Sequence, residues 1–205
     1  MTMRTRIAAA LALVVLLGGC AGQSPAPSST AGPAPQTPAP AQTPAETPTP
    51  VLTATIPTEC TDVVDPATYA ATFSTVPLVD SDGTGAVVPT PPPAGATYRE
   101  IVMSGVELRC DWDDVNSDFN ALDLIIGTVT PNVGAAYLDQ LADDGYRCED
   151  VLDGRRCQRV GPVEGFPEIE QTSTWFLRDD VFIQVGQVTF PTSGLLAAIV
   201  ERVWS

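Results

Sequence analysis

The chain has neither histidine nor lysine among its 205 residues. Without histidine it lacks the commonest general base and metal ligand of proteins, and without lysine it cannot use Schiff-base or serine–lysine mechanisms. Phosphate-binding glycine loops and the G-x-S-x-G pattern are missing too. A carboxylate pair remains a route to hydrolysing a wall polymer, but with 25 acidic residues some pair will be close by chance. We therefore expect a non-enzymatic protein without a cofactor.

Positive charge is scarce: ten arginines face 25 acidic residues, which gives a formal net charge of −15. A field of this sign repels nucleic acid and anionic lipid headgroups, so we expect no nucleic-acid partner. The same field attracts cations and basic partners, although an acidic surface also serves solubility alone.

Long hydrophobic runs are missing as well. The apolar stretch 7–17 is shorter than the roughly 20 residues that span a bilayer. It follows Arg4 and Arg6 and ends in small residues, which is typical of a secretory signal over 1–19. The motif Leu17-Gly18-Gly19-Cys20 resembles the lipobox of bacterial lipoproteins, with Gly18 where the family prefers Ala, Ser or Thr. The alternative is an ordinary signal peptide whose cleavage site includes Cys20.

The lipobox resemblance implies cleavage before Cys20, whose sulfur then carries a diacylglycerol with palmitate-type chains. Two acyl chains hold a protein stably on a bilayer, whereas one binds only marginally. The expected partner of Cys20 is thus the lipid bilayer. The expected location is the cell membrane, lipid-anchored and facing the outside of the cytoplasmic membrane.

Half of the twenty prolines fall in the Pro/Thr/Ala-rich segment that follows Cys20. Such a composition cannot bury enough apolar surface to offset the entropy of ordering. We therefore predict a disordered tether over 20–57. The remaining 58–205 is long enough for a single acidic extracytoplasmic domain with its own core.

Four cysteines remain in that domain: Cys60, Cys110, Cys148 and Cys157. An even number in an exported domain implies two disulfides, for which three connectivities are possible. Cys148 and Cys157 flank the Asp153-Gly154 turn signal, which favours Cys148–Cys157 and leaves Cys60–Cys110. A Cys₄ zinc site is the alternative, but no pair has the usual close C-x₂₋₄-C spacing.

Periodicity and turn signals predict three helices and about six strands. The helices are expected over 65–73, 133–142 and 194–204, the first with Tyr69, Ala70 and Phe73 inward. The strands are expected over 106–112, 121–130, 146–151, 156–160, 172–178 and 181–190, with loops over 77–93 and around Pro162 and Pro167. This order indicates an α+β fold, an antiparallel sheet packed with two to three helices and stapled by two disulfides.

Two acidic loops are weak candidates for a calcium site. They contain Asp80 and Asp82, and Asp111, Asp113 and Asp118. Neither completes the ligand pattern of an EF-hand loop. The alternative is a pair of solvated turns in which Asp and Asn make local hydrogen bonds, and we assign no metal.

Two further groups of residues have both a binding and a structural interpretation. Trp112 shares a strand face with Cys110, and we favour packing against a disulfide over an exposed aromatic platform for a ligand. Arg155, Arg156 and Arg159 gather near one turn, where they would receive an anion or, as we favour, pair with neighbouring carboxylates.

Lipobox, Pro/Thr-rich tether and disulfide-containing domain with a Cys-x-Trp strand together resemble small actinobacterial cell-envelope lipoproteins. The use of arginine without lysine is typical of a GC-rich genome and agrees with such a source. The resemblance implies a binding or interaction module at the cell envelope, whose partner is an envelope protein or a small ligand. The alternative is a lipoprotein that binds a small solute or cation for a membrane complex.

Overall fold

The computed structural model describes residues 53–79, 85–114, 116–117, 119–190 and 193–205. All of them lie in one compact unit spanning 48–205. Ala54 and Ile56 pack on its core, and the Thr55 amide donates to the Val203 carbonyl over 2.8 Å. Packed structure thus begins ahead of residue 58, where the sequence placed the start of the domain. No helix in this described part is long and apolar enough to cross a membrane.

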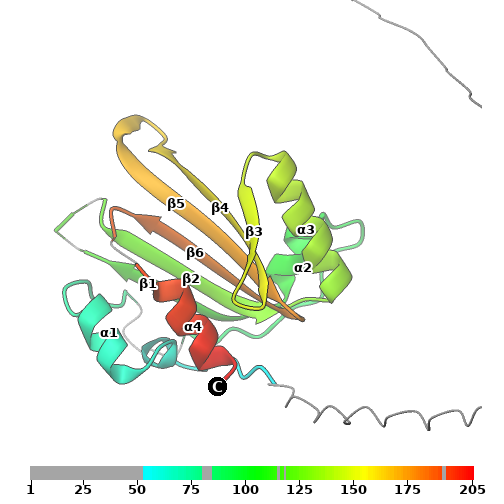
Figure 1. Cartoon of the computed structure of the whole chain (residues 1–205), viewed down its shortest axis with the longest axis horizontal. Coiled ribbons are helices and arrows are strands. Elements are labelled where there is room, and N and C mark those ends of the chain that lie inside the picture. The colour runs from blue at the N-terminus through cyan, green and yellow to red at the C-terminus, as the bar shows by residue number, and fades with distance from the viewer. Residues whose placement is uncertain (1–52, 80–84, 115, 118, 191–192) are drawn as a thin grey trace, which may run out of the picture. The chain divides into compact units, whose positions relative to one another are not determined.

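Six antiparallel strands form one sheet in the order β1-β2-β6-β5-β4-β3 (Figure 1). They are β1 (Val106–Asp113), β2 (Ala121–Thr128), β3 (Arg147–Val151), β4 (Gly154–Val163), β5 (Phe166–Arg178) and β6 (Val181–Val188). The predicted α+β fold and its antiparallel sheet are confirmed. All three expected hairpins are present. Pairing of β6 with β2 joins the first hairpin to the rest of the sheet.

The turn between β3 and β4 differs in detail from the expected one. Val151 pairs with Gly154, so the two turn residues are Leu152 and Asp153, both with positive φ (53° and 58°). Positive φ at both positions is the signature of a type I′ hairpin turn. Gly154 instead opens β4, where an added Cβ would lie 2.5 Å from the Leu177 carbonyl oxygen. The glycine is needed for close approach of the chains.

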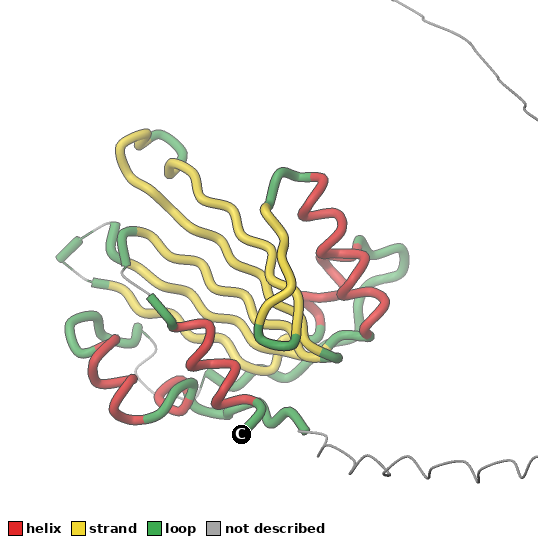
Figure 2. The backbone as a smooth tube through the Cα atoms, in the orientation of Figure 1, coloured by secondary structure: helices red, strands yellow, loops and turns green. Residues whose placement is uncertain are grey.

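The loop expected around Pro162 and Pro167 is wrong, because both prolines lie in strands. β4 and β5 run side by side as one long hairpin whose turn is residues 164–165 (Figure 2). β3 pairs with β4 only as far as Gln158, so Pro162 occupies a stretch whose outer edge β3 does not cover. Proline is tolerated there because its missing N–H interrupts no ladder on that side.

Both outer edges of the sheet are blunted. On the β1 side, the segment predicted as a loop donates from Val79 to Asp111 and from Val87 to Glu107, and Gly85 accepts from Arg109, each over 2.8 Å. On the other side, β3 is five residues long and largely charged and exposed. Short, charged or covered strands are the usual means of protecting a sheet edge.

Four α-helices and a short 3₁₀ helix pack on the sheet: η1 (Cys60–Asp62), α1 (Pro66–Phe73), α2 (Tyr98–Ser104), α3 (Pro131–Asp143) and α4 (Leu195–Val203). α1 begins as predicted, with the Asp65 carboxylate accepting from the Ala67 and Thr68 amides over 3.0 and 3.1 Å. Phe73 is buried and Tyr69 half-buried, but Ala70 is exposed, contrary to prediction. The sequence analysis did not predict α2, which a capping box between Thr97 and Glu100 begins.

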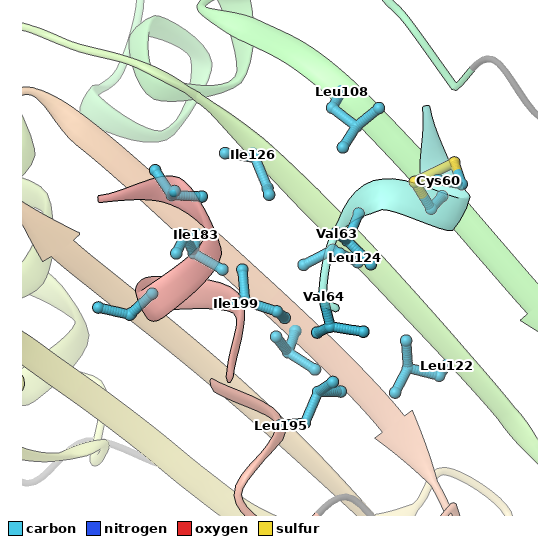
Figure 3. Close-up of a cluster of buried hydrophobic side chains, with 14 of the residues drawn as sticks. Cys60, Val63, Val64, Leu108, Leu122, Leu124, Ile126, Ile183, Leu195 and Ile199 are labelled. Atoms are coloured by element: carbon cyan, nitrogen blue, oxygen red, sulfur yellow. A yellow bond between two sulfur atoms is a disulfide. The ribbon is translucent and has the colours of Figure 1, made fainter. Parts of the chain in front are cut away.

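The helices form two separate pairs, α1 with α4 and α2 with α3 (Figure 1). On the first side, which we call the closed face, η1, α1 and α4 pack on alternate residues of the sheet. Their apolar cluster includes Leu108, Leu122, Leu124, Ile126, Ile183 and Ile199 (Figure 3). On the second side, which we call the open face, α2 and α3 cover a smaller cluster that includes Ile125, Trp175 and Phe182.

The favoured cysteine pairing is confirmed, and each face of the sheet contains one of the two disulfides. Cys60–Cys110 joins η1 to β1 inside the closed-face cluster, where both residues are fully buried (Figure 3). Cys148–Cys157 links directly opposed residues of β3 and β4 beneath α3, with a Cα–Cα distance of 4.0 Å. Trp112 is 1 % exposed and lies in the same apolar cluster as Cys60 and Cys110, so it is no exposed platform, and its ring stacks on Phe73 at 4.3 Å.

Candidate functional site

The open face contains a groove with a volume of about 1460 Å³ beside α2 and α3. Its floor is the sheet itself. Under α3 the open-face side chains are apolar, as with Phe182 and Leu177, but two to four residues farther along each strand they become small or polar. The groove therefore begins where the helix layer ends.

A row of residues crosses the floor at the level where this change occurs. The strand register sets Asp111 opposite Asp123, Asp123 opposite Gly186, Gly186 opposite Ser173, and Ser173 opposite Arg159. Directly opposed residues of an antiparallel sheet share one face. We call these five residues the polar row. It has two carboxylates at the β1–β2 end and a guanidinium at the β4 end.

Gly186 determines where the Asp123 carboxylate lies. A Cβ at position 186 would meet the Asp123 Oδ1 at 2.1 Å and its Cγ at 2.8 Å. The carboxylate therefore lies across the backbone of β6, in space that any other residue would fill. No hydrogen bond or ion pair reaches Asp123 from the residues that the structure describes.

Gln184 is the most unusual residue of the floor. Its side chain lies between Ile125 and Trp175 in the register and is 8 % exposed. Within the described ranges, its amide makes no hydrogen bond to another side chain or to the backbone. The buried side-chain atoms that lack a hydrogen bond within the described ranges are Asn120 Oδ1 and Trp204 Nε1, so the polar end of Gln184 is accessible from the groove. A glutamine held this way at the base of a groove is typical of a binding site.

One wall of the groove is α3, with Tyr137 and Gln140, and another is α2, with Arg99. The Tyr137 ring packs edge-on against Trp175 at 4.9 Å between centroids. Burial raises the pKa of the Tyr137 hydroxyl above its ordinary value of 10.0, and the positive charge of Arg99 partly opposes this shift. Tyr137 thus stays neutral and contributes shape more than charge.

The β4 end of the groove is held together by its own contacts. The Tyr146 hydroxyl donates to the Ser173 hydroxyl oxygen over 3.2 Å, and the Arg159 guanidinium lies over the Tyr146 ring at 4.6 Å. At the β1 end Arg109 pairs with Asp111 over 3.2 Å. These contacts hold Ser173, Arg159 and Asp111 in place. Asp123, which lies beside Gln184, has no such contact within the described ranges.

The structure places the residues singled out from the sequence in different regions. Asp111 and Asp113 line the groove. Cys20, Asp80, Asp82 and Asp118 lie outside the described residues. Among those that are described, no group of three or more acidic or cysteine side chains is arranged to hold a metal ion.

The arginines near the β3–β4 turn mostly pair with carboxylates, as we favoured. Arg155 donates to Asp139 over 2.6 Å, and Arg156 pairs with Glu149 across the hairpin. Arg159 lies instead over the Tyr146 ring, where it faces the groove.

A second, smaller pocket of about 320 Å³ lies on the closed face between α4 and the β3–β4 hairpin. Its size falls in the range of small-molecule sites. Its polar lining, however, is already paired, with Arg156 on Glu149 and Gln158 donating to Thr174 over 2.9 Å. This pocket offers fewer free polar groups than the groove.

The sequence analysis missed Asp123, Gln184 and Gly186. A usable signal was present, because Asp123 is a lone charge inside an apolar strand and Gln184 interrupts the apolar run 181–185. Such interruptions mark places where a buried strand faces something other than core.

The chain was also compared with known proteins. No protein-family model matches the chain, and no curated protein matches it significantly.

Proposed function

We propose that this protein is a non-enzymatic binding module of the cell envelope and that the groove on the open face is its binding site. The observation that carries the proposal is Gln184, a largely buried side chain whose amide has no hydrogen-bond partner among the described residues and borders the groove beside Asp123. Both groups border the groove, where a ligand can hydrogen-bond to them in place of water.

The dimensions of the groove favour an interaction partner over a small solute. Small-molecule sites usually enclose about 300–1000 Å³, whereas this groove reaches about 1460 Å³ and lies along the surface of the sheet. A groove of this kind suits an extended segment of another molecule. A lipoprotein that carries a small solute would be expected to surround it more fully.

The proposal includes lipid anchoring through Cys20 at the outside of the cytoplasmic membrane. Its support is the lipobox motif Leu17-Gly18-Gly19-Cys20 after a short signal. The two disulfides also fit an oxidising, extracytoplasmic location. The test is the Cys20→Ala variant, which should move from the membrane to the soluble fraction and lose the mass of its acyl chains. A membrane-bound variant with the unchanged unlipidated mass would contradict the anchor.

Site-specific photocrosslinking in intact cells tests the groove. A photoreactive residue at Gln140, an exposed position of α3 in the groove wall, should crosslink a partner. The Gln184→Leu change should abolish that crosslink. A photoreactive residue at Glu201, exposed on α4 on the other side of the sheet, is the matched control. Crosslinks from Glu201 alone, or crosslinks at Gln140 that ignore Gln184→Leu, would overturn the assignment of the site.

A further inference from the structure

We infer that the acidic end of the groove binds a basic side chain carried on an extended segment of a partner protein. The inference rests on the groove being the binding site proposed above, and it specifies the ligand. Asp111, Asp123 and Gln184 supply the groups that would bind the basic side chain, and the groove crosses the sheet away from them.

Two carboxylates face each other at this end without sufficient compensating charge. Asp111 and Asp123 are directly opposed on β1 and β2, which places their Cβ atoms about 4.5–5.5 Å apart. Like charges in this position repel each other. Arg109 compensates Asp111 over 3.2 Å, but within the described ranges no cation pairs with Asp123. A positive group from outside would relieve the repulsion.

Gln184 supplies a second ligand group next to these acids, independent of them. It lies two residues from Gly186 on the same face of β6, so it is about 7 Å along the strand from the point where Asp123 crosses. Its side chain is more than nine-tenths buried and borders the groove. The amide carbonyl accepts hydrogen bonds, as the carboxylates do. These acceptors suit the several N–H donors of a guanidinium or ammonium group.

Arg159, at the other end of the groove, fixes the direction of the segment. Arg159 lies on β4, four strands from Asp111, which corresponds to about 19 Å at the usual strand spacing. That length accommodates about six residues of extended chain. Arg159 would repel a basic residue at its own end and attract a carboxylate. The net charge of −15 adds long-range attraction for a basic partner.

The test uses the full chain with Cys20→Ala, which removes the proposed acylation site. The probes are two blocked peptides, acetyl-Ser-Gly-Arg-Gly-Ser-amide and the same peptide with neutral citrulline in place of arginine. In an NMR titration at low salt, the arginine peptide should shift the amide signals of Asp123, Gln184 and Gly186. The citrulline peptide should bind at least about tenfold more weakly, because it keeps the shape and loses the charge.

Three variants locate the binding site. Asp123→Asn removes one charge with little change in shape, and Gly186→Ala displaces the carboxylate by filling its space. Both should weaken binding of the arginine peptide by about tenfold or more. Glu201→Gln removes an equal charge from α4 and should leave binding unchanged. Amide spectra with native dispersion for each variant exclude unfolding as the cause.

The possible outcomes separate this inference from the proposed function. Equal binding of both peptides in the groove would overturn the basic-residue inference and leave the groove as a binding site. Binding of Ca²⁺ to the same acids, with no peptide binding, would also overturn it. Binding of the arginine peptide that responds equally to Glu201→Gln would reduce the effect to net charge and overturn the site. The crosslink from Gln140 in intact cells, and its loss in the Gln184→Leu variant, test the proposed function separately.

Discussion

The two faces of the sheet share strands but differ in how far their apolar layer extends. On the closed face, β1, β2 and β6 present consecutive apolar side chains, from Leu108 to Trp112 and from Leu122 to Ile126. On the open face, the same strands are apolar only beneath α3 and then present Asp111, Asp123 and Gly186. One alternating pattern thus encodes a complete core on one side and a core plus a groove on the other.

This difference separates residues that stabilise the fold from residues available for binding. The closed face buries its apolar side chains beneath helices and contains the disulfide that closes the longer loop. On the open face, Gln184 and Asp123 make no hydrogen bond within the described ranges, and both border the groove. Mutations in the closed-face core should therefore lower the free energy of unfolding, whereas mutations of Asp123 and Gln184 should mainly weaken binding.

The largest expected effect is the loss of the closed-face disulfide. Cys60 and Cys110 are 50 residues apart, so the chain-entropy relation gives a loss of about 4 kcal/mol in the free energy of unfolding. Cys148 and Cys157 are 9 residues apart, and the same relation gives about 2.6 kcal/mol. Paired Cys→Ala variants compared by urea unfolding check the order. A larger loss for the open-face pair would contradict the comparison.

Truncating the closed-face core should follow in size. Ile183 is fully buried between the sheet and α4, and Ile183→Ala should lower the free energy of unfolding by about 2–5 kcal/mol. The matched change on the polar row, Ser173→Ala, removes a hydrogen bond to Tyr146 and should cost only about 0.5–1.5 kcal/mol. Equal losses in chemical denaturation would mean that both faces contribute alike to stability.

Gln184→Leu should have the opposite sign. In a largely buried position it replaces an amide that has no hydrogen bond within the described ranges with an apolar group of similar size, so the free energy of unfolding should rise by up to about 1 kcal/mol. The same variant should no longer bind the arginine peptide. Destabilisation on calorimetry would show that the Gln184 amide has a partner in the free protein.

The smallest expected effect is a decrease in the free energy of unfolding at acidic pH. Hydrogen bonds from Thr68 lower the pKa of Asp65, and those from Thr97 lower the pKa of Glu100. The Asn116 amide likewise lowers the pKa of Asp114. A carboxylate with a lowered pKa in the folded state stabilises the fold above its unfolded pKa and loses that contribution as the pH falls through its folded pKa. The free energy of unfolding should therefore fall as the pH drops below the ordinary values of 3.8 and 4.5.

The double variant Asp65→Asn, Glu100→Gln checks this acid response. Both replacements retain helix-capping ability without titrating. The decrease in stability between pH 6 and pH 3 should be shallower than in the unmodified protein. An identical pH profile in urea titrations would show that these caps do not couple to protons.

Local patterns in the sequence were enough for most of the elements but not for the site. Alternation and turn residues predict β1, β2 and the Cys148–Cys157 hairpin, because each depends on neighbours in the chain. α2 was missed although Thr97 and Glu100 form a capping box, since only seven helical residues follow a proline-rich segment. The groove depends on where α3 ends relative to four strands. That position depends on the pairing of strands that are far apart in the sequence, and no local sequence pattern contains this information.

The covered edges of the sheet have a consequence for how copies of this protein behave when crowded. An exposed strand edge is a template on which a second molecule can add its own strand and start an aggregate. Here the backbone of 78–79 and 85–87 occupies the β1 edge, and Pro162 and the charged β3 interrupt the opposite one. The segment from Leu78 to Val87 thus acts as a barrier to edge-to-edge polymerisation. Deleting it should leave a protein that self-associates through β1 even where its core is intact.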